Sequence, residues 1–168
     1  MEASPTPKKA KEKQAFVDSN RLHWSEYLGM AGALVLAGSL FLPWFGTSDS
    51  NPNSLVGGKK GDFNAFEIYN SLPYWLLAAC IAPFLLTWIV ARAHKLTWRP
   101  GEITMIVGIT AFALIIINGI IFGKPGDTVD MEFRIGYLVG LLGTTMIAAS
   151  GLFRQAEGGR VRKAPGTL

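Results

Sequence analysis

The sequence predicts an all-α membrane protein, a bundle of four transmembrane helices with both chain termini in the cytoplasm. Four segments of the 168-residue chain contain no Asp, Glu, Lys or Arg, namely 27–48, 68–91, 103–123 and 135–153. A bilayer core about 30 Å thick takes roughly 20 apolar helical residues to cross. A helix satisfies its own backbone hydrogen bonds in lipid, so each segment is expected to be one.

The distribution of charge predicts the orientation. Twelve of the 16 Lys and Arg residues precede the first apolar segment, link the second to the third, or follow the fourth. Short cytoplasmic loops collect basic residues, so these three regions are expected inside the cell and the chain in the cell membrane. The basic tails could also contact anionic lipid headgroups, but we favour orientation as their role. The net charge of +4 therefore does not indicate nucleic-acid binding.

Three regions follow from these patterns. A disordered basic tail is expected at 1–21, a four-helix membrane domain at 22–154 and a second disordered basic tail at 155–168. The four spans are expected at about 24–45, 72–93, 101–123 and 132–153. These spans and their links use nearly the whole sequence and leave no room for a separate soluble domain.

The first span begins at Trp24, a residue type that favours the membrane interface. Pro43 lacks an amide hydrogen, so the helix is expected to kink or stop there and to place Trp44 and Phe45 in the outer aromatic belt. The segment 46–62 is rich in Gly, Ser, Asn and Asp and is expected to be a flexible loop.

A short helix is indicated before the second span. Asn64 is followed three residues later by Glu67, which is the pattern of a capping box. Phe63, Phe66 and Tyr69 recur at helical spacing and would lie against the membrane surface. The alternative is an early start of the second span, and the sequence does not choose between the two.

The spans contain a few polar or helix-breaking residues. Pro83 is expected to bend the second span, and Thr87 lies one turn later. Asn118 is the most polar residue of the third span, which begins with Pro100 in its first turn. Pro83, Thr87 and Asn118 are therefore the candidate polar or kink site. The single cysteine, Cys80, excludes an internal disulfide and is expected to pack as a small apolar residue.

Small residues at helical spacing predict close helix packing. Lipid removes the hydrophobic drive for helix association, so small side chains that let backbones approach gain importance. The candidates are Gly29, Ala33, Ala37, Gly119, Gly123, Gly136, Gly140, Gly143 and Gly151. We expect mainly packing within the chain, with contact to another membrane protein or a second copy as the alternative.

The ionisable residues near the spans fall at the predicted span ends. Glu26 and Glu102 are expected at the inner side as solvated ends or helix-dipole partners. A carboxylate at mid-depth is missing from the sequence, which argues against a proton-coupled transporter. At the outer side, Arg134 is expected to pair within a cluster of Glu67, Asp130 and Glu132.

The sequence contains no catalytic, metal or cofactor motif. His23 and His94 both lie near the inner interface, whereas a metal site needs at least three converging ligands. A phosphate-binding loop, a zinc-protease motif and a nucleophile elbow are all missing. We therefore expect no enzyme activity, no metal and no cofactor.

Three segments resemble a loose group of small, uncharacterised four-span membrane proteins of high-GC Gram-positive bacteria. They are Phe41-Leu42-Pro43-Trp44-Phe45, Asn64-Ala65-Phe66-Glu67, and the run 134–142 with Ala148-Ala149-Ser150-Gly151. The resemblance covers about 24–155 and implies the four-span fold, but it brings no activity. The leading hypothesis is an accessory or scaffolding subunit that packs against lipid and other membrane proteins. The alternative is a small transporter or channel subunit.

Overall fold

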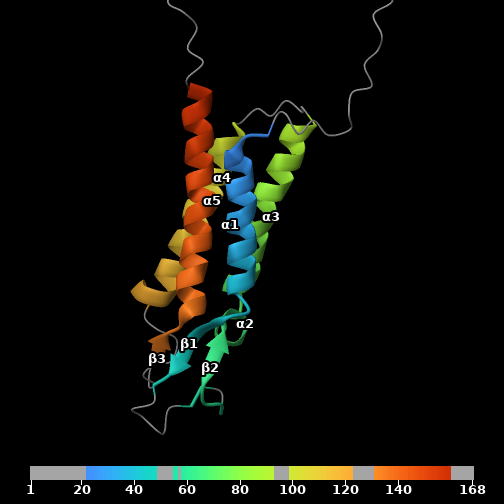
Figure 1. The fold of residues 1–168 in the computed structure, drawn as a ribbon. Helices are drawn as coiled ribbons and strands as arrows, with labels where there is room; N and C mark the ends of the chain where they lie inside the picture. The colour runs from blue at the N-terminus through green and yellow to red at the C-terminus, as the bar shows by residue number, and fades with distance from the viewer. Residues whose placement is uncertain (1–21, 49–54, 57, 93–98, 123–130, 160–168) are drawn as a thin grey trace, which may run out of the picture.

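A computed structural model describes residues 22–48, 55–56, 58–92, 99–122 and 131–159. Within them, four long helices run side by side, and a small sheet with a short helix closes one end (Figure 1). The helices are α1 (Trp24–Ser39), α3 (Leu72–Ala91), α4 (Pro100–Ile116), which the π-helix η2 (Ile117–Ile121) continues, and α5 (Ile135–Gly159). We call the end where α1 begins and α5 ends the terminal end, and the opposite end the sheet end.

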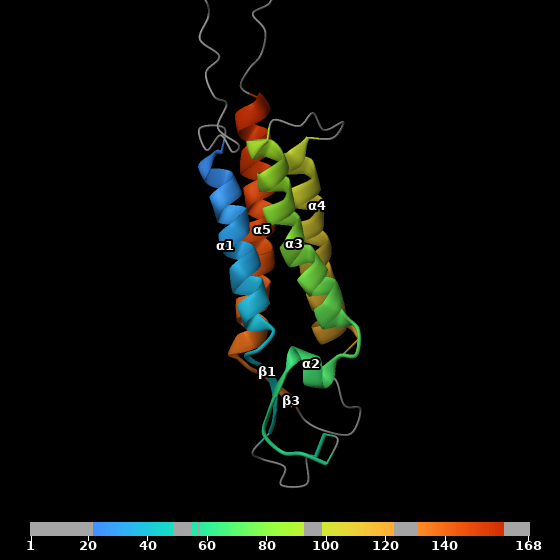
Figure 2. The same cartoon turned by 90° about the vertical axis from the view of Figure 1, so that its right-hand side faces the viewer.

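Helix α5 is the central element of the bundle. It packs extensively against α1 and α4, whereas α3 touches α1 and α4 over smaller areas. Figure 2 shows α5 between α1 on one side and α4 on the other. Within the described residues, three helical segments are long and apolar enough to cross a membrane: Leu72–Ala91, Gly101–Ile121 and Ile135–Glu157.

Helix α1 is shorter than the predicted first span of 24–45. It ends at Ser39, whose hydroxyl donates to the Leu36 carbonyl at 2.6 Å, and the amide of Leu42 donates to the Ser39 carbonyl at 3.0 Å. These bonds close the last turn, and Pro43 cannot extend the helix because it has no N–H to donate. The chain then continues as a strand.

The all-α prediction missed a three-stranded antiparallel sheet at the sheet end. Strand β1 (Pro43–Thr47) lies in the middle, with β2 (Asp62–Asn64) on one side and β3 (Met131–Phe133) on the other. Phe45 lies opposite Phe63 in β2 and opposite Phe133 in β3. Two of the strands have three residues each, too short for the alternation that identifies a strand in a sequence.

The residues around Asn64 form a separate short helix, α2 (Ala65–Ile68). The Asn64 side chain accepts from the amide of Glu67 at 3.0 Å, and the Glu67 carboxylate accepts from the amide of Asn64 at 2.9 Å. This capping box and the break at Tyr69 separate α2 from α3. The short-helix interpretation is therefore the one that the structure shows.

Aromatic rings fill the space between the sheet and the helices. Trp44 and Phe45 are fully buried, and Tyr137 of α5 lies 5.7 Å from each of their ring centroids. The Trp44 indole N–H donates to the Ser39 carbonyl at 2.7 Å, so its polar atom is satisfied inside the core. Trp44 and Phe45 were expected in an exposed belt; they are instead the core that joins the sheet to the bundle.

Candidate functional site

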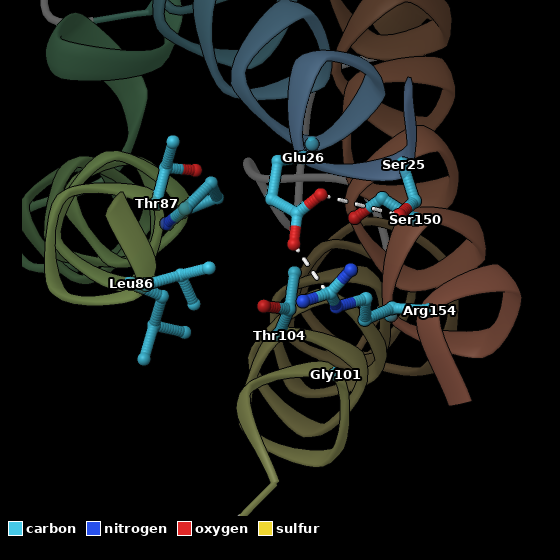
Figure 3. A pocket seen from close by; sticks show the side chains of 12 residues that line it. Ser25, Glu26, Leu86, Thr87, Gly101, Thr104, Ser150 and Arg154 are labelled. Atoms are coloured by element: carbon cyan, nitrogen blue, oxygen red, sulfur yellow. Dashed lines mark hydrogen bonds and ion pairs between the residues drawn. The ribbon is translucent and has the colours of Figure 1, made fainter. Parts of the chain in front are cut away.

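A small cavity with several polar residues among its lining lies at the terminal end, between all four long helices. Its polar lining comes from Ser25 and Glu26 of α1, Thr87 of α3, Thr104 of α4, and Ser150 and Arg154 of α5 (Figure 3). About 20 Å³ of it is open to the centre of a water molecule. That volume suits one small guest and excludes an organic ligand, which requires several hundred cubic ångströms.

The centre of the site is an ion pair between α1 and α5. Glu26 Oε1 lies 3.0 Å from Arg154 Nε, and the side chains are 9% and 24% exposed. The other oxygen, Oε2, accepts from the His23 amide at 2.7 Å and from the Ser25 hydroxyl at 3.5 Å. One carboxylate therefore caps the first turn of α1 and also binds α5. Removing two charges from water costs free energy, and a buried ion pair recovers this cost only if its other donors and acceptors are also hydrogen-bonded.

Of the two expectations for Glu26, the solvated helix end is wrong, whereas the helix-dipole partner agrees with its place in the first turn of α1. Helix α5 continues to Gly159, past the predicted end of the fourth span at 153, so Arg154 lies within the helix and opposite the first turn of α1. The segment 155–159, predicted as part of a disordered tail, is helical as well. A signal for this was present in the sequence, because Glu26 and Arg154 have opposite charges at the same predicted end.

A second pair joins the same two helices closer to their ends. His23 Nδ1 lies 3.3 Å from Glu157 Oε2. The two pairs together link the start of α1 to the last turns of α5.

The hydroxyl groups of the cavity differ in their partners. Ser150 Oγ donates to the Ile147 carbonyl at 2.7 Å, which leaves its lone pairs available to accept. Thr87 is 8% exposed, and among the described residues its hydroxyl makes no hydrogen bond. Gly29 makes room for Ser150, since a Cβ at Gly29 would lie 2.8 Å from Ser150 Oγ.

The predicted polar or kink residues divide between the two ends. Pro83 and Thr87 both line the cavity. Asn118 lies toward the sheet end in η2, where its amide donates to the Leu114 carbonyl at 2.8 Å. The irregular helix there receives two further bonds, from Tyr69 to the Asn118 carbonyl and from Tyr137 to the Ile115 carbonyl, both at 3.2 Å. These three donors satisfy carbonyls in and just before the π-helix.

The predicted outer charge cluster has different members. Arg134 Nε lies 3.0 Å from Asp62 Oδ1, and its Nη1 lies 3.6 Å from Glu132. Glu67 caps α2, and Asp130 lies outside the described residues. Asp62 was missed because only the antiparallel pairing of β1 with β2 and with β3 brings it close to Arg134.

Most of the predicted helix-packing residues lie in crossings within the chain. Gly29, Ala33, Gly119, Gly136, Gly140, Gly143 and Gly151 are buried, Ala37 is partly buried, and Gly123 lies outside the described residues. A Cβ at Gly143 would lie 2.6 Å from the Leu36 amide nitrogen, and one at Gly119 would lie 2.5 Å from the Tyr137 ring. Internal packing thus accounts for these glycines without a partner.

The chain was compared with protein-family models, curated proteins and solved structures, and nothing in any of the three matches it. In the part of the chain that the structure describes, no three His, Cys, Asp or Glu side chains converge as metal ligands would. The site is therefore a water-sized cavity beside the Glu26–Arg154 ion pair.

Proposed function

We propose that this chain is a four-span protein of a bacterial cell membrane, with both termini cytoplasmic, that serves as a non-catalytic accessory or scaffolding subunit of a larger membrane complex. The four-span part of the proposal includes α1, which at 16 residues is about 24 Å long. Helix α1 lies beside α5, which is long enough to span, so both occupy the same layer of the membrane. The resemblance to four-span proteins of high-GC Gram-positive bacteria agrees with this topology.

The observation that carries the scaffolding proposal is the sealed core between the cavity and the sheet. Leu36, Leu40, Leu76, Ile115 and Ile147 are all fully buried in this region. Among the described residues, these closely packed apolar side chains argue against a polar route for a solute. A bundle that is closed in this way fits a structural role better than a conducting one.

Photo-crosslinking in living cells tests the scaffolding proposal. A photoreactive phenylalanine analogue is placed at one exposed apolar position on each helix in turn: Leu34, Ile81, Ile109 or Leu142. A partner that docks on one face will crosslink from one helix or two adjacent ones and leave the others in contact with lipid alone. Crosslinks to lipid from all four positions would refute a stable partner in the membrane.

Cysteine labelling tests the topology separately. In a Cys80→Ala background, a membrane-impermeant maleimide is expected to label a cysteine at Ser54 in intact cells and not one at Ala10. Labelling at Ala10 without lysis would reverse the orientation.

A small transporter or channel subunit is the second candidate, and the cavity itself favours it. Ionisable side chains buried at membrane depth commonly mark a solute or proton path. The Glu26–Arg154 pair and the neighbouring Pro83 and Thr87 would then form the inner part of such a path. The test is to measure ion and proton flux into proteoliposomes that contain the protein. A flux rate equal to that of empty vesicles would refute the transporter or channel proposal.

A further inference from the structure

The hydroxyl group of Thr87 has no hydrogen-bond partner among the described residues. The residue is 8% exposed, and its side chain points toward the cavity (Figure 3). Buried polar groups in native proteins nearly always have a partner, which is either protein or ordered water. Among the lining residues, Glu26 Oε1 is a buried atom whose contact is the ion pair with Arg154 rather than a hydrogen bond of good geometry.

The size of the cavity decides what the partner is. A buried water needs about 10–15 Å³ of the space open to its centre and two to four polar neighbours. The cavity offers about 20 Å³, enough for one water molecule. Thr87, Glu26 and Ser150 are among the residues that line the cavity, and their side-chain oxygens are the candidate partners of such a water.

The charge of the lining agrees with a neutral guest. The carboxylate of Glu26 and the guanidinium of Arg154 cancel at 3.0 Å, so the site has no excess charge to attract an ion. We propose that the cavity binds one ordered water molecule, which joins the Thr87 hydroxyl of α3 to the Glu26–Arg154 pair that α1 and α5 share. This site stands on the geometry of the cavity and is independent of the proposed role in a complex.

The water has a structural consequence for α3. This helix makes smaller contacts with the bundle than α5 does, and Pro83 interrupts its hydrogen bonding next to the cavity. A bridging water supplies the polar connection between α3 and the ion pair that direct contacts lack.

The sign of one substitution tests the proposal. Thr87→Val keeps the shape of the side chain and removes the hydroxyl. If the cavity is dry, the change removes an unsatisfied polar group and leaves the protein as stable or more stable. If a water bridges the site, the change removes one of its partners, and we expect the folding equilibrium constant to fall at least 5-fold. Thr110→Val is the matched control, because Thr110 is exposed on α4 and has no hydrogen bond among the described residues.

Both variants are measured by SDS titration in dodecylmaltoside micelles, followed by far-ultraviolet circular dichroism. Thr87→Val with a stability equal to or above that of Thr110→Val overturns the proposal. Replacing sodium by choline at constant ionic strength, in the dodecyl sulfate as well as in the buffer salt, should change neither result. A stabilisation that requires sodium would assign the site to a cation and would also overturn it.

Radiolytic hydroxyl-radical labelling of the unmodified protein provides a second measurement that does not depend on a variant. Bound water generates radicals where it sits, so Leu86, which lines the cavity, should be labelled although it is only 6% exposed. Leu76 of the same helix is fully buried and does not line the cavity, so it serves as the control. Labelling of Leu86 no faster than that of Leu76 would show a dry cavity.

Discussion

Replacing Gly143 by alanine should destabilise the bundle, because the added methyl group would meet backbone rather than a movable side chain. An ideal Cβ at Gly143 lies 2.6 Å from the amide nitrogen of Leu36 and 2.9 Å from the carbonyl oxygen of Gly32. Comfortable contacts between heavy atoms lie at about 3.5–4.0 Å. Helices α1 and α5 must therefore separate by about 1 Å where they cross.

The size of the effect follows from two opposing terms. Overpacking of a well-packed site costs about 1–3 kcal/mol, and contact with backbone places Gly143 at the upper end of that range. Alanine regains about 1 kcal/mol through its higher helix propensity. The net loss is about 2 kcal/mol, or roughly 30-fold in the folding equilibrium constant. Burial of the new methyl group does not offset this loss, because lipid supplies no hydrophobic drive.

Gly38 of the same helix pair provides the control. A Cβ there meets nothing within 4 Å, so Gly38→Ala should only gain helix propensity and stabilise the protein by up to about 1 kcal/mol. The midpoints of SDS-induced unfolding in dodecylmaltoside micelles compare the two variants. If Gly143→Ala unfolds at the same SDS fraction as Gly38→Ala, the α1–α5 crossing is not as close as the structure has it, and the packing argument fails.

Three further predictions concern the sheet end and use the same titration. Tyr137→Phe removes the hydrogen bond to the Ile115 carbonyl and should cost about 1 kcal/mol; an unchanged midpoint would show that the bond contributes nothing. Arg134→Gln should cost less than about 1 kcal/mol and nothing at 1 M salt, because its pair with Asp62 is exposed; a larger loss that persists in salt contradicts this. Burial, with a smaller contribution from Tyr137, raises the pKa of Tyr69 above its ordinary value, so folding favours the protonated phenol. The stability that Tyr69 contributes is full below about pH 10 and is lost as the pH rises toward the folded-state pKa, and Tyr69→Phe should abolish that loss.

The long helices could be predicted because crossing a bilayer requires a continuous run of about 20 apolar residues. Stretches without charge of about 20 residues identified α3, α4 and α5, and the small residues along them indicated close packing. The capping pair Asn64 and Glu67 indicated a helix start from side-chain chemistry, although the sequence left open whether it was α2 or an early start of the second span. In each case the signal is local, so it can be read from a few neighbouring residues.

The elements that the sequence did not reveal depend on contacts between distant segments. Strand β1 continues the apolar stretch of the first span, and only its pairing with β2 and β3 makes it a strand. The π-helix likewise depends on Tyr69 and Tyr137, whose hydroxyls reach its carbonyls from other elements. Such features follow from tertiary structure and carry no periodic signal.

The candidate site was missed for a related reason. Pro83 and Thr87 were selected as polar residues of a span, and both line the cavity. Glu26 was expected as a solvated end or a helix-dipole partner, and Arg154 was counted only among the basic residues that follow the fourth span, because position along the chain was taken as a measure of depth in the membrane. The length of α5 is what determines the environment of Glu26. Because α5 continues to Gly159, its last turns lie beside Glu26 and place Arg154 against it.

The two ends of the bundle are held together by different means, and this difference bears on how the molecule could move. At the sheet end, the ion pairs of Arg134 lie near the surface, and the connection to the bundle is the aromatic core, in which Trp44, Tyr69 and Tyr137 donate hydrogen bonds to backbone carbonyls. At the terminal end, the connections are ion pairs between side chains and a cavity that borders α3. Side chains beside a cavity can change rotamer at a smaller cost than rings that are packed in a core. Any conformational response of this protein, to a partner or to protonation, should therefore begin at the terminal end and displace α3 before α5.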